Sequence, residues 1–105
     1  MKILPKETEF VYSLKKAFKT LYIEEQYQCL NYRIDLFIPS LNLAIEFDEN
    51  NHKSNQLKDL KRQIKIENVL KCSFMRINEK DDIFEVSNLI VEKIMNVKNN
   101  LTIVT

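Results

Sequence analysis

The chain has 105 residues, of which 45% are hydrophobic and 10% aromatic, and this is sufficient for one domain with a single core. Its 16 basic and 15 acidic residues leave a net charge of +1, which excludes the strongly basic composition of a dedicated nucleic-acid-binding module. No apolar run approaches the roughly 20 residues of a membrane-spanning helix, and the start, MKILPKETEF, has no secretory signal, so we expect a cytoplasmic protein without a membrane partner.

The first predicted element is a helix over residues 8–21. Its apolar residues recur at spacings of three and four, which is typical of an amphipathic helix that packs one stripe on a core. These residues are Phe10, Val11, Leu14, Phe18 and Leu21. Continuing the stripe towards the N-terminus reaches Glu7, whereas Glu9 falls on the other side. An acid at a helix start also complements the helix dipole, so either glutamate has a purely structural explanation.

Two strands are predicted next, over residues 32–39 (YRIDLFIP) and 41–48 (LNLAIEFD). A hairpin closed around Ser40 and Leu41 would pair residues whose numbers sum to 81, so that Asp35 lies opposite Glu46. Alternation then places one wholly apolar set on the core side, and this set is Ile34, Leu36, Ile38, Leu43, Ile45 and Phe47. The other face carries Arg33, Asp35, Phe37, Ala44, Glu46 and Asp48.

The remaining elements are a helix, a strand and a final helix. The helix over residues 55–70 is expected to direct Leu57, Leu60, Ile64 and either Val69 or Leu70 inward. The strand is SFMRIN. Asp81 or Asp82 then caps a helix whose inward residues are Ile83, Val86, Ile90 and Ile94. The predicted order, αββαβα, describes a single mixed α/β domain in which helices flank a small mixed sheet.

The facing acids Asp35 and Glu46 are the first candidates for chemistry. Like charges directly opposite each other destabilise a strand pair, so this pair requires a cation. Magnesium, which binds one or two carboxylates together with waters and substrate phosphates, would supply it. The alternative is that Arg33, two positions from Asp35, pairs with one acid while the other acids are solvated.

His52 follows the second strand closely, six residues after Glu46. A lone histidine is more often a surface or capping residue, but an imidazole close to two acids can accept a proton from an attacking water. Asp59 would orient His52 if the second helix crosses the acidic face. The basic residues around this helix are either a phosphate-binding surface or a solvated helix face, and they include Lys53, Lys58, Lys61 and Arg62.

The pattern RIDLFIP…LAIEFDENNH…LKDLKRQIKIENVLKCSFMRIN resembles the nuclease core of the PD-(D/E)xK superfamily, with its restriction-endonuclease-like fold. Within it, the pattern is similar to very short patch repair endonucleases and to phage mobile-intron homing endonucleases that carry a Glu-Asp-x-His-Asp constellation. The resemblance covers Glu7 to about Ile94. It matches the constellation to Glu7 or Glu9, Asp35, Glu46, His52 and Asp59.

This resemblance implies a magnesium- or manganese-dependent endonuclease acting on double-stranded DNA in the cytoplasm of a bacterial host. Asp35, Glu46 and the Phe47 carbonyl would hold the metal ion, and His52 would activate water. The basic set Lys53, Lys58, Lys61 and Arg62 would bind the substrate. Residues 1–105 would be the catalytic domain, and a homodimer or a separate DNA-binding domain would supply site selection.

One position departs from the superfamily pattern, because Asp48 stands where a lysine is usual, two residues after the second acid. This favours either His52 as the base or a catalytically inactive nuclease fold that binds DNA or regulates another protein. A repair nickase or junction resolvase on the same fold is a further alternative. The last alternative is a protein-interaction domain whose acidic side chains are simply solvated.

Overall fold

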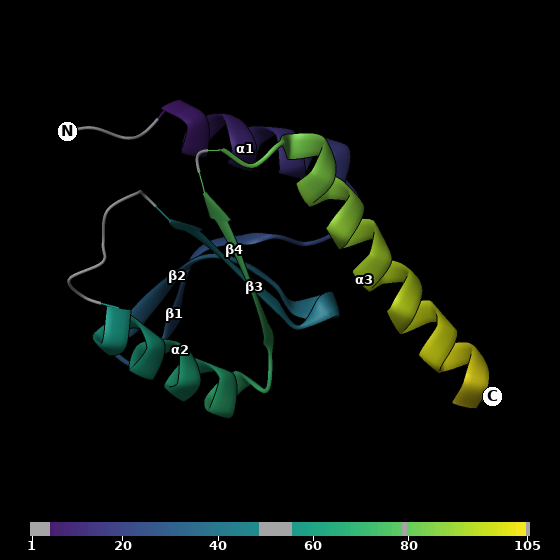
Figure 1. The fold of residues 1–105 in the computed structure, drawn as a ribbon. Helices are drawn as coiled ribbons and strands as arrows, with labels where there is room; N and C mark the ends of the chain where they lie inside the picture. Colours follow the sequence, from purple (N-terminus) through teal and green to yellow (C-terminus); the bar gives the residue numbers. More distant parts are fainter. Residues whose placement is uncertain (1–4, 49–55, 79, 105) are drawn as a thin grey trace.

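A four-stranded mixed sheet forms the centre of the structure, a computed structural model that describes residues 5–48, 56–78 and 80–104. The strands lie in the order β1-β2-β3-β4; the first two pairings are antiparallel, and β3 and β4 are parallel across the helical crossover α2 (Figure 1). The elements are α1 (Pro5–Ala17), β1 (Glu24–Cys29), β2 (Tyr32–Ile38), a 3-10 turn (Pro39–Leu41), β3 (Leu43–Asp48), α2 (Gln56–Leu70), β4 (Ser73–Asn78) and α3 (Ile83–Val104). The predicted class, a small mixed sheet flanked by helices, is confirmed.

The predicted register of the central hairpin is confirmed. Leu36 pairs with Ile45 and Ile38 pairs with Leu43, and both sums equal 81. The 3-10 turn leads into Asn42, whose φ of 49° and ψ of 50° lie in the left-handed region that asparagine tolerates better than most residues. One step beyond the Leu36–Ile45 pair, this register brings Asp35 and Glu46 to adjacent positions.

The strand β1 is absent from the predicted order, which must be corrected to αβββαβα for the described residues. Its sequence, EEQYQC, lacks the β-branched residues that identify a strand, and it lies at the sheet edge, where polar side chains are solvated. Tyr27 stacks on Phe37 with 4.7 Å between ring centroids, and Cys29 is buried in the same cluster. The paired residues skip Gln26 and Asp35, and Gln26 has a φ of 52°.

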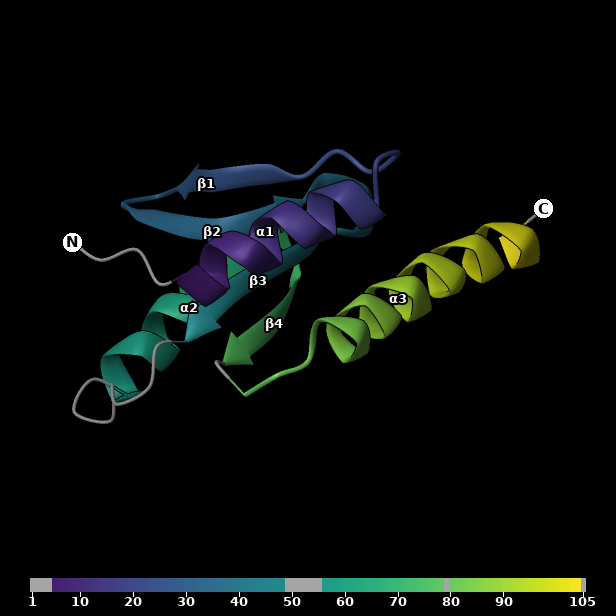
Figure 2. The same cartoon turned by 90° about the horizontal axis from the view of Figure 1, so that it is seen from above.

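The larger core lies between the sheet and the helices α1 and α3. Phe10 and Leu14 of α1 and Val86 and Ile90 of α3 are buried against one face of β2 and β3. The inward stripes predicted for both helices are therefore confirmed. Figure 2 shows that the C-terminal part of α3 extends beyond the sheet. No described helix meets the length and apolarity required to cross a membrane.

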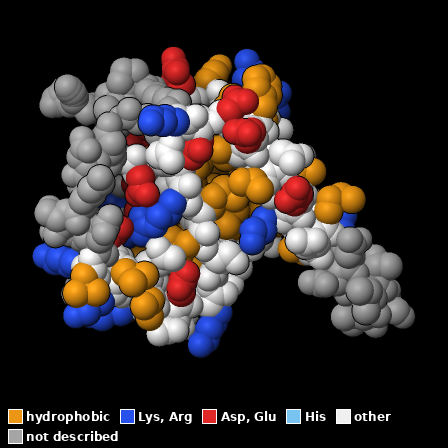
Figure 3. All heavy atoms as spheres, viewed as in Figure 1, with side chains coloured by type: hydrophobic (Ala, Val, Ile, Leu, Met, Phe, Trp, Pro, Cys, Tyr) orange, Lys and Arg blue, Asp and Glu red, His pale blue; other side chains and the backbone are white. Residues whose placement is uncertain are grey.

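The helix α2 covers the opposite face, but the predicted orientation of this helix was wrong. Leu57 and Ile64 are 67% and 47% exposed, whereas Ile66 is completely buried. Leu60 and Val69 are also exposed, but Leu70, the predicted alternative to Val69, is partly buried and packs in the same cluster as Ile66. Figure 3 shows hydrophobic side chains at the surface over this helix.

The reason for this orientation is the polar end of the sheet under the first turns of α2. Glu46 of β3 lies there and pairs with Arg62, so the side of the helix that carries Arg62 faces the sheet. Only the later turns meet apolar residues, and there Ile66 packs with Phe37 and Ala44. Ile34 belongs to this second core as well, so its assignment to the apolar face with Leu36 is corrected. The alternation breaks at the unpaired position of Asp35, which faces Gln26.

Candidate functional site

A cavity of about 580 Å³ opens where the first turns of α1 and α2 approach the sheet. Four of the acids predicted from the sequence line it, and they come from four different elements: Glu7 from α1, Asp35 from β2, Glu46 from β3 and Asp59 from α2. The other lining residues are Tyr32, Phe47, Asp48, Lys58, Arg62 and Arg76. The structure thus brings together residues that are spread over more than half of the chain.

The two central carboxylates are held differently. Oδ2 of Asp35 accepts a hydrogen bond of 2.9 Å from the backbone N–H of Phe47. Glu46 is buried, with 9% exposure. Burial raises the pKa of Glu46, Arg62 partly offsets this through a hydrogen bond and its charge, and the charge of Asp35 raises it further. The repulsion expected between the two acids is therefore present in the site.

Arg62 supplies the cation that this pair requires. Its Nη2 and Nη1 lie 2.9 and 3.4 Å from the two carboxylate oxygens of Glu46. Nη2 also donates to the carbonyl of Arg33 at 2.9 Å, and the guanidinium lies 5.5 Å from the ring centroid of Tyr32. Burial would lower the pKa of Arg62, but the hydrogen bond and charge of Glu46 raise it, so this arginine remains charged.

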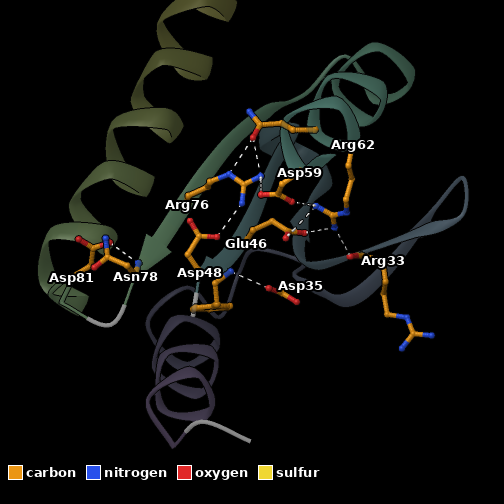
Figure 4. A network of polar contacts seen from close by, with 11 residues as sticks. Arg33, Asp35, Glu46, Asp48, Asp59, Arg62, Arg76, Asn78 and Asp81 are labelled. Carbon is orange, nitrogen blue, oxygen red and sulfur yellow. Dashed lines mark hydrogen bonds and ion pairs between the residues drawn. The ribbon is translucent and has the colours of Figure 1, made fainter. Parts of the chain in front are cut away.

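The alternative to a metal ion was that Arg33 pairs with one of the two acids, and the structure does not show this pairing among the described residues. Its side chain is exposed and points away from Asp35, as Figure 4 shows. Within the described residues, no ion pair joins Arg33 to Asp35. Among the contacts of the described residues, Arg33 contributes to the site through its backbone carbonyl.

A second arginine extends the ion pairs along the sheet. Arg76 of β4 binds Asp48 at 3.0 Å and Asp59 at 3.1 Å, and its Nε donates to Gln63 at 3.0 Å. Asp59 also lies 3.8 Å from Arg62. We call the alternating series Glu46, Arg62, Asp59, Arg76 and Asp48 the acid–arginine network (Figure 4).

Sequence reasoning did not place Arg76 or Gln63 at this cavity. Arg76 is the register partner of Glu46 in the parallel pairing of β3 and β4. That register depends on the length and path of the crossover, which no local pattern reveals. The one available signal was a charged residue between the apolar residues of the strand SFMRIN.

The first turn of α1 places Glu7, and not Glu9, at the cavity. Phe10 contacts Phe47 edge-to-face, with 6.0 Å between ring centroids, and this contact joins the helix to the end of β3. Glu7 precedes Phe10 by three residues and therefore lies on the same side of the helix. Glu9 is exposed and borders a different cavity with Asp81.

The predicted DNA-binding residues lie in different environments. Lys58 is exposed and lines the cavity, Lys61 is exposed outside its lining, and Arg62 is largely buried against Glu46. His52 and Lys53 fall outside the described residues. The positions of Lys58 and Lys61 are compatible with contact to a phosphate backbone, which remains a prediction.

The donor set fits magnesium by type. Asp35, Glu46 and the Phe47 carbonyl offer oxygen ligands, and magnesium in proteins commonly takes one or two carboxylates and completes its shell with water. Within residues 5–48, 56–78 and 80–104, no three histidine, cysteine, aspartate or glutamate side chains converge as a metal-binding group. The chain matches no protein-family model and no curated protein.

The balance between burial and ion pairing at Glu46 predicts a specific pH dependence. The raised pKa of Glu46 means that the folded chain binds the carboxyl proton more tightly than the unfolded chain does. The stability that protonated Glu46 contributes is therefore lost as the pH rises from about 4.5, the ordinary pKa, through the raised pKa of the folded state. The free energy of unfolding of the wild type, minus that of Glu46→Gln, should therefore decrease over this range. Urea unfolding at successive pH values measures this difference.

The control for this measurement is Glu25→Gln, which removes an exposed carboxylate paired with Lys15. Its difference from the wild type should stay nearly constant over the same pH range, because surface ion pairs contribute at most about 1 kcal/mol. A difference at Glu46 that instead grows with pH would show that the attraction of Arg62 outweighs burial.

Proposed function

We propose that this chain is a metal-dependent endonuclease domain that hydrolyses DNA phosphodiester bonds and is related to the PD-(D/E)xK superfamily. The observation that carries the proposal is the meeting of Glu7, Asp35, Glu46 and Asp59 at one cavity. The resemblance to the superfamily assigned all four to one acidic constellation, with Glu9 as the alternative to Glu7. A solvated surface would not require four elements to direct their acids to the same place.

The residues suited to hold magnesium or manganese are Asp35, Glu46 and the Phe47 carbonyl. When bound, the metal ion would act as a Lewis acid that stabilises charge on the phosphoryl oxygens. The hydrogen bond from the Phe47 N–H fixes the Asp35 carboxylate with respect to β3, so the two acidic strands hold their donors rigidly. Glu7 adds a further negative group on the α1 side of the cavity.

His52 is the proposed general base, because Asp48 replaces the lysine that is usual in the superfamily. An imidazole with a near-neutral pKa can accept the proton of an attacking water at physiological pH. Asp48 itself is bound by Arg76, so its carboxylate is already neutralised in the acid–arginine network.

Double-stranded DNA is the proposed partner, and the net charge of +1 indicates weak binding by this domain alone. Lys53, Lys58 and Lys61 are the proposed phosphate contacts, and Arg62 joins them only if it leaves Glu46. Phosphate contacts position a protein without reading sequence, so target selection would come from a homodimer or an additional DNA-binding domain. A bacterial host cytoplasm is the proposed setting.

A second candidate function is a DNA-binding or regulatory module with an inactive nuclease fold. Two observations favour it: Asp48 occupies the lysine position, and arginines neutralise Glu46, Asp48 and Asp59. Divalent-metal binding separates the two candidates, because only the nuclease requires it.

The proposal is tested by incubating the protein with supercoiled plasmid at low salt in magnesium. We expect nicked or linear DNA in magnesium, none in EDTA, and a loss of at least about 100-fold for His52→Ala, the lower range for a general base. Weak DNA binding could also prevent cleavage, so binding of Mn²⁺ to the protein is measured in parallel by calorimetry. Absence of both cleavage and metal binding would reject the nuclease in favour of the inactive module.

A further inference from the structure

The side chain of Arg62 is involved in both metal binding and DNA binding as proposed for this cavity. Its guanidinium makes the two-pronged contact to Glu46, a proposed metal ligand. It also belongs to the predicted substrate-binding set. Both roles cannot be filled in one position, because a carboxylate enclosed by a guanidinium has few lone pairs left for a metal ion.

The surroundings of Arg62 provide a second position for its charge. Asp59 lies one helical turn earlier on α2, with its Oδ1 at 3.8 Å from Nη1 of Arg62. The Asp59 side chain is 46% exposed, compared with 11% for Glu46, so it lies nearer to the cavity mouth. A rotation of the Arg62 side chain alone would therefore move the guanidinium from Glu46 towards Asp59 and solvent.

We propose that Arg62 is an exchangeable counter-ion, which neutralises Glu46 in the metal-free protein and moves towards Asp59 and a DNA phosphate when a divalent cation takes that carboxylate. This inference rests on the proposed function. It makes metal binding and phosphate binding mutually favourable, because each depends on the release of the same ion pair. Arg62 is a positioning residue in the first state and a phosphate contact in the second.

The exchange predicts that removal of the Arg62 charge tightens metal binding. Binding of Mn²⁺ to the DNA-free protein is measured by calorimetry at high pH, where Glu46 is ionised. Arg62→Gln should bind Mn²⁺ about tenfold more tightly than the wild type, the equivalent of one charge-assisted hydrogen bond that the metal ion no longer displaces. The proposal is overturned if this variant binds with unchanged or lower affinity.

The matched control is Arg76→Gln, which removes the same charge from the same cavity wall. Arg76 contacts Asp48 and Asp59, and within the described residues no hydrogen bond or ion pair joins it to Glu46. Its effect on Mn²⁺ affinity should stay below about threefold, consistent with a screened charge that makes no direct contact. Equal increases in Mn²⁺ affinity in Arg62→Gln and Arg76→Gln would overturn the exchange, since the loss of positive charge from the cavity would then explain both increases.

A measurement on the wild type makes the test independent of variant folding. Slow rotation of a paired guanidinium gives resolved Nη signals in NMR spectra. At saturating Mg²⁺, we expect the separate Nη signals of Arg62 to coalesce, while the Nη signals of Arg76 stay resolved. Nη signals of Arg62 that stay unchanged would overturn the exchange. If the wild type binds no divalent ion, the metal site and the exchange both fail, whereas normal metal binding with an immobile Arg62 refutes the exchange alone.

Discussion

Asp35→Asn is expected to reduce magnesium-dependent DNA cleavage by at least about 1,000-fold, which corresponds to roughly 4 kcal/mol of transition-state stabilisation. The substitution removes the charge of a proposed metal ligand. It keeps an oxygen that can accept the hydrogen bond from the Phe47 N–H, so the strand geometry should survive. Single-turnover cleavage of plasmid DNA measures the effect, and thermal unfolding verifies that the variant is folded.

A matched control for this loss is Glu25→Gln, which makes the same change of charge on β1. Glu25 pairs only with the exposed Lys15 among the contacts of the described residues and does not line the cavity. Cleavage by this variant should remain within about twofold of the wild type, because an exposed pair is largely screened. If Asp35→Asn retained comparable activity, the proposed metal ligands would be incorrect.

Ile66→Ala is expected to lower the free energy of unfolding by about 2–5 kcal/mol, the usual cost of removing a fully buried aliphatic side chain. Ile66 is the completely buried apolar residue of α2 and packs in the second core with Phe37 and Ala44. A loss of this size is a large fraction of the roughly 5–15 kcal/mol that stabilises a domain. Urea unfolding monitored by circular dichroism measures it.

Ile64→Ala provides the comparison, since it makes the same substitution two residues earlier in the same helix. Ile64 is 47% exposed, and alanine is the better helix former, so its effect should stay within about 0.5 kcal/mol. Sequence periodicity alone predicted Ile64 as the inward residue. A larger loss at Ile64 than at Ile66 would therefore restore that prediction and contradict the orientation of α2 in the structure.

Local sequence patterns predicted the parts of the fold in which burial follows one simple period. The stripe from Phe10 to Leu14 and the stripe from Val86 to Ile90 lie on helices that cover an apolar face, so helical spacing identified their inward sides. The register of β2 and β3 followed from the short connection at Pro39 and from alternation in both strands. The same register predicted that Asp35 and Glu46 would be neighbours.

The remaining features depend on contacts between distant segments. The inward face of α2 carries Asp59, Arg62 and Gln63 because β3 and β4 present charges beneath it, and a hydrophobic pattern cannot anticipate a polar helix–sheet contact. The strand β1 exists through its pairing with β2, since its own residues have little strand preference. Arg76 enters the site through a parallel register that only the crossover determines.

The connectivity of the acid–arginine network also bears on the order in which the domain folds. Asp35 and Glu46 meet within a short hairpin, whereas the bond from Arg62 to Glu46 spans 16 residues and the bond from Arg76 to Asp48 spans 28. Closure of longer loops costs more entropy and tends to come later. The hairpin therefore has to form against the repulsion of its own carboxylates, and we expect the docking of α2 and then β4 to be the late steps that relieve it.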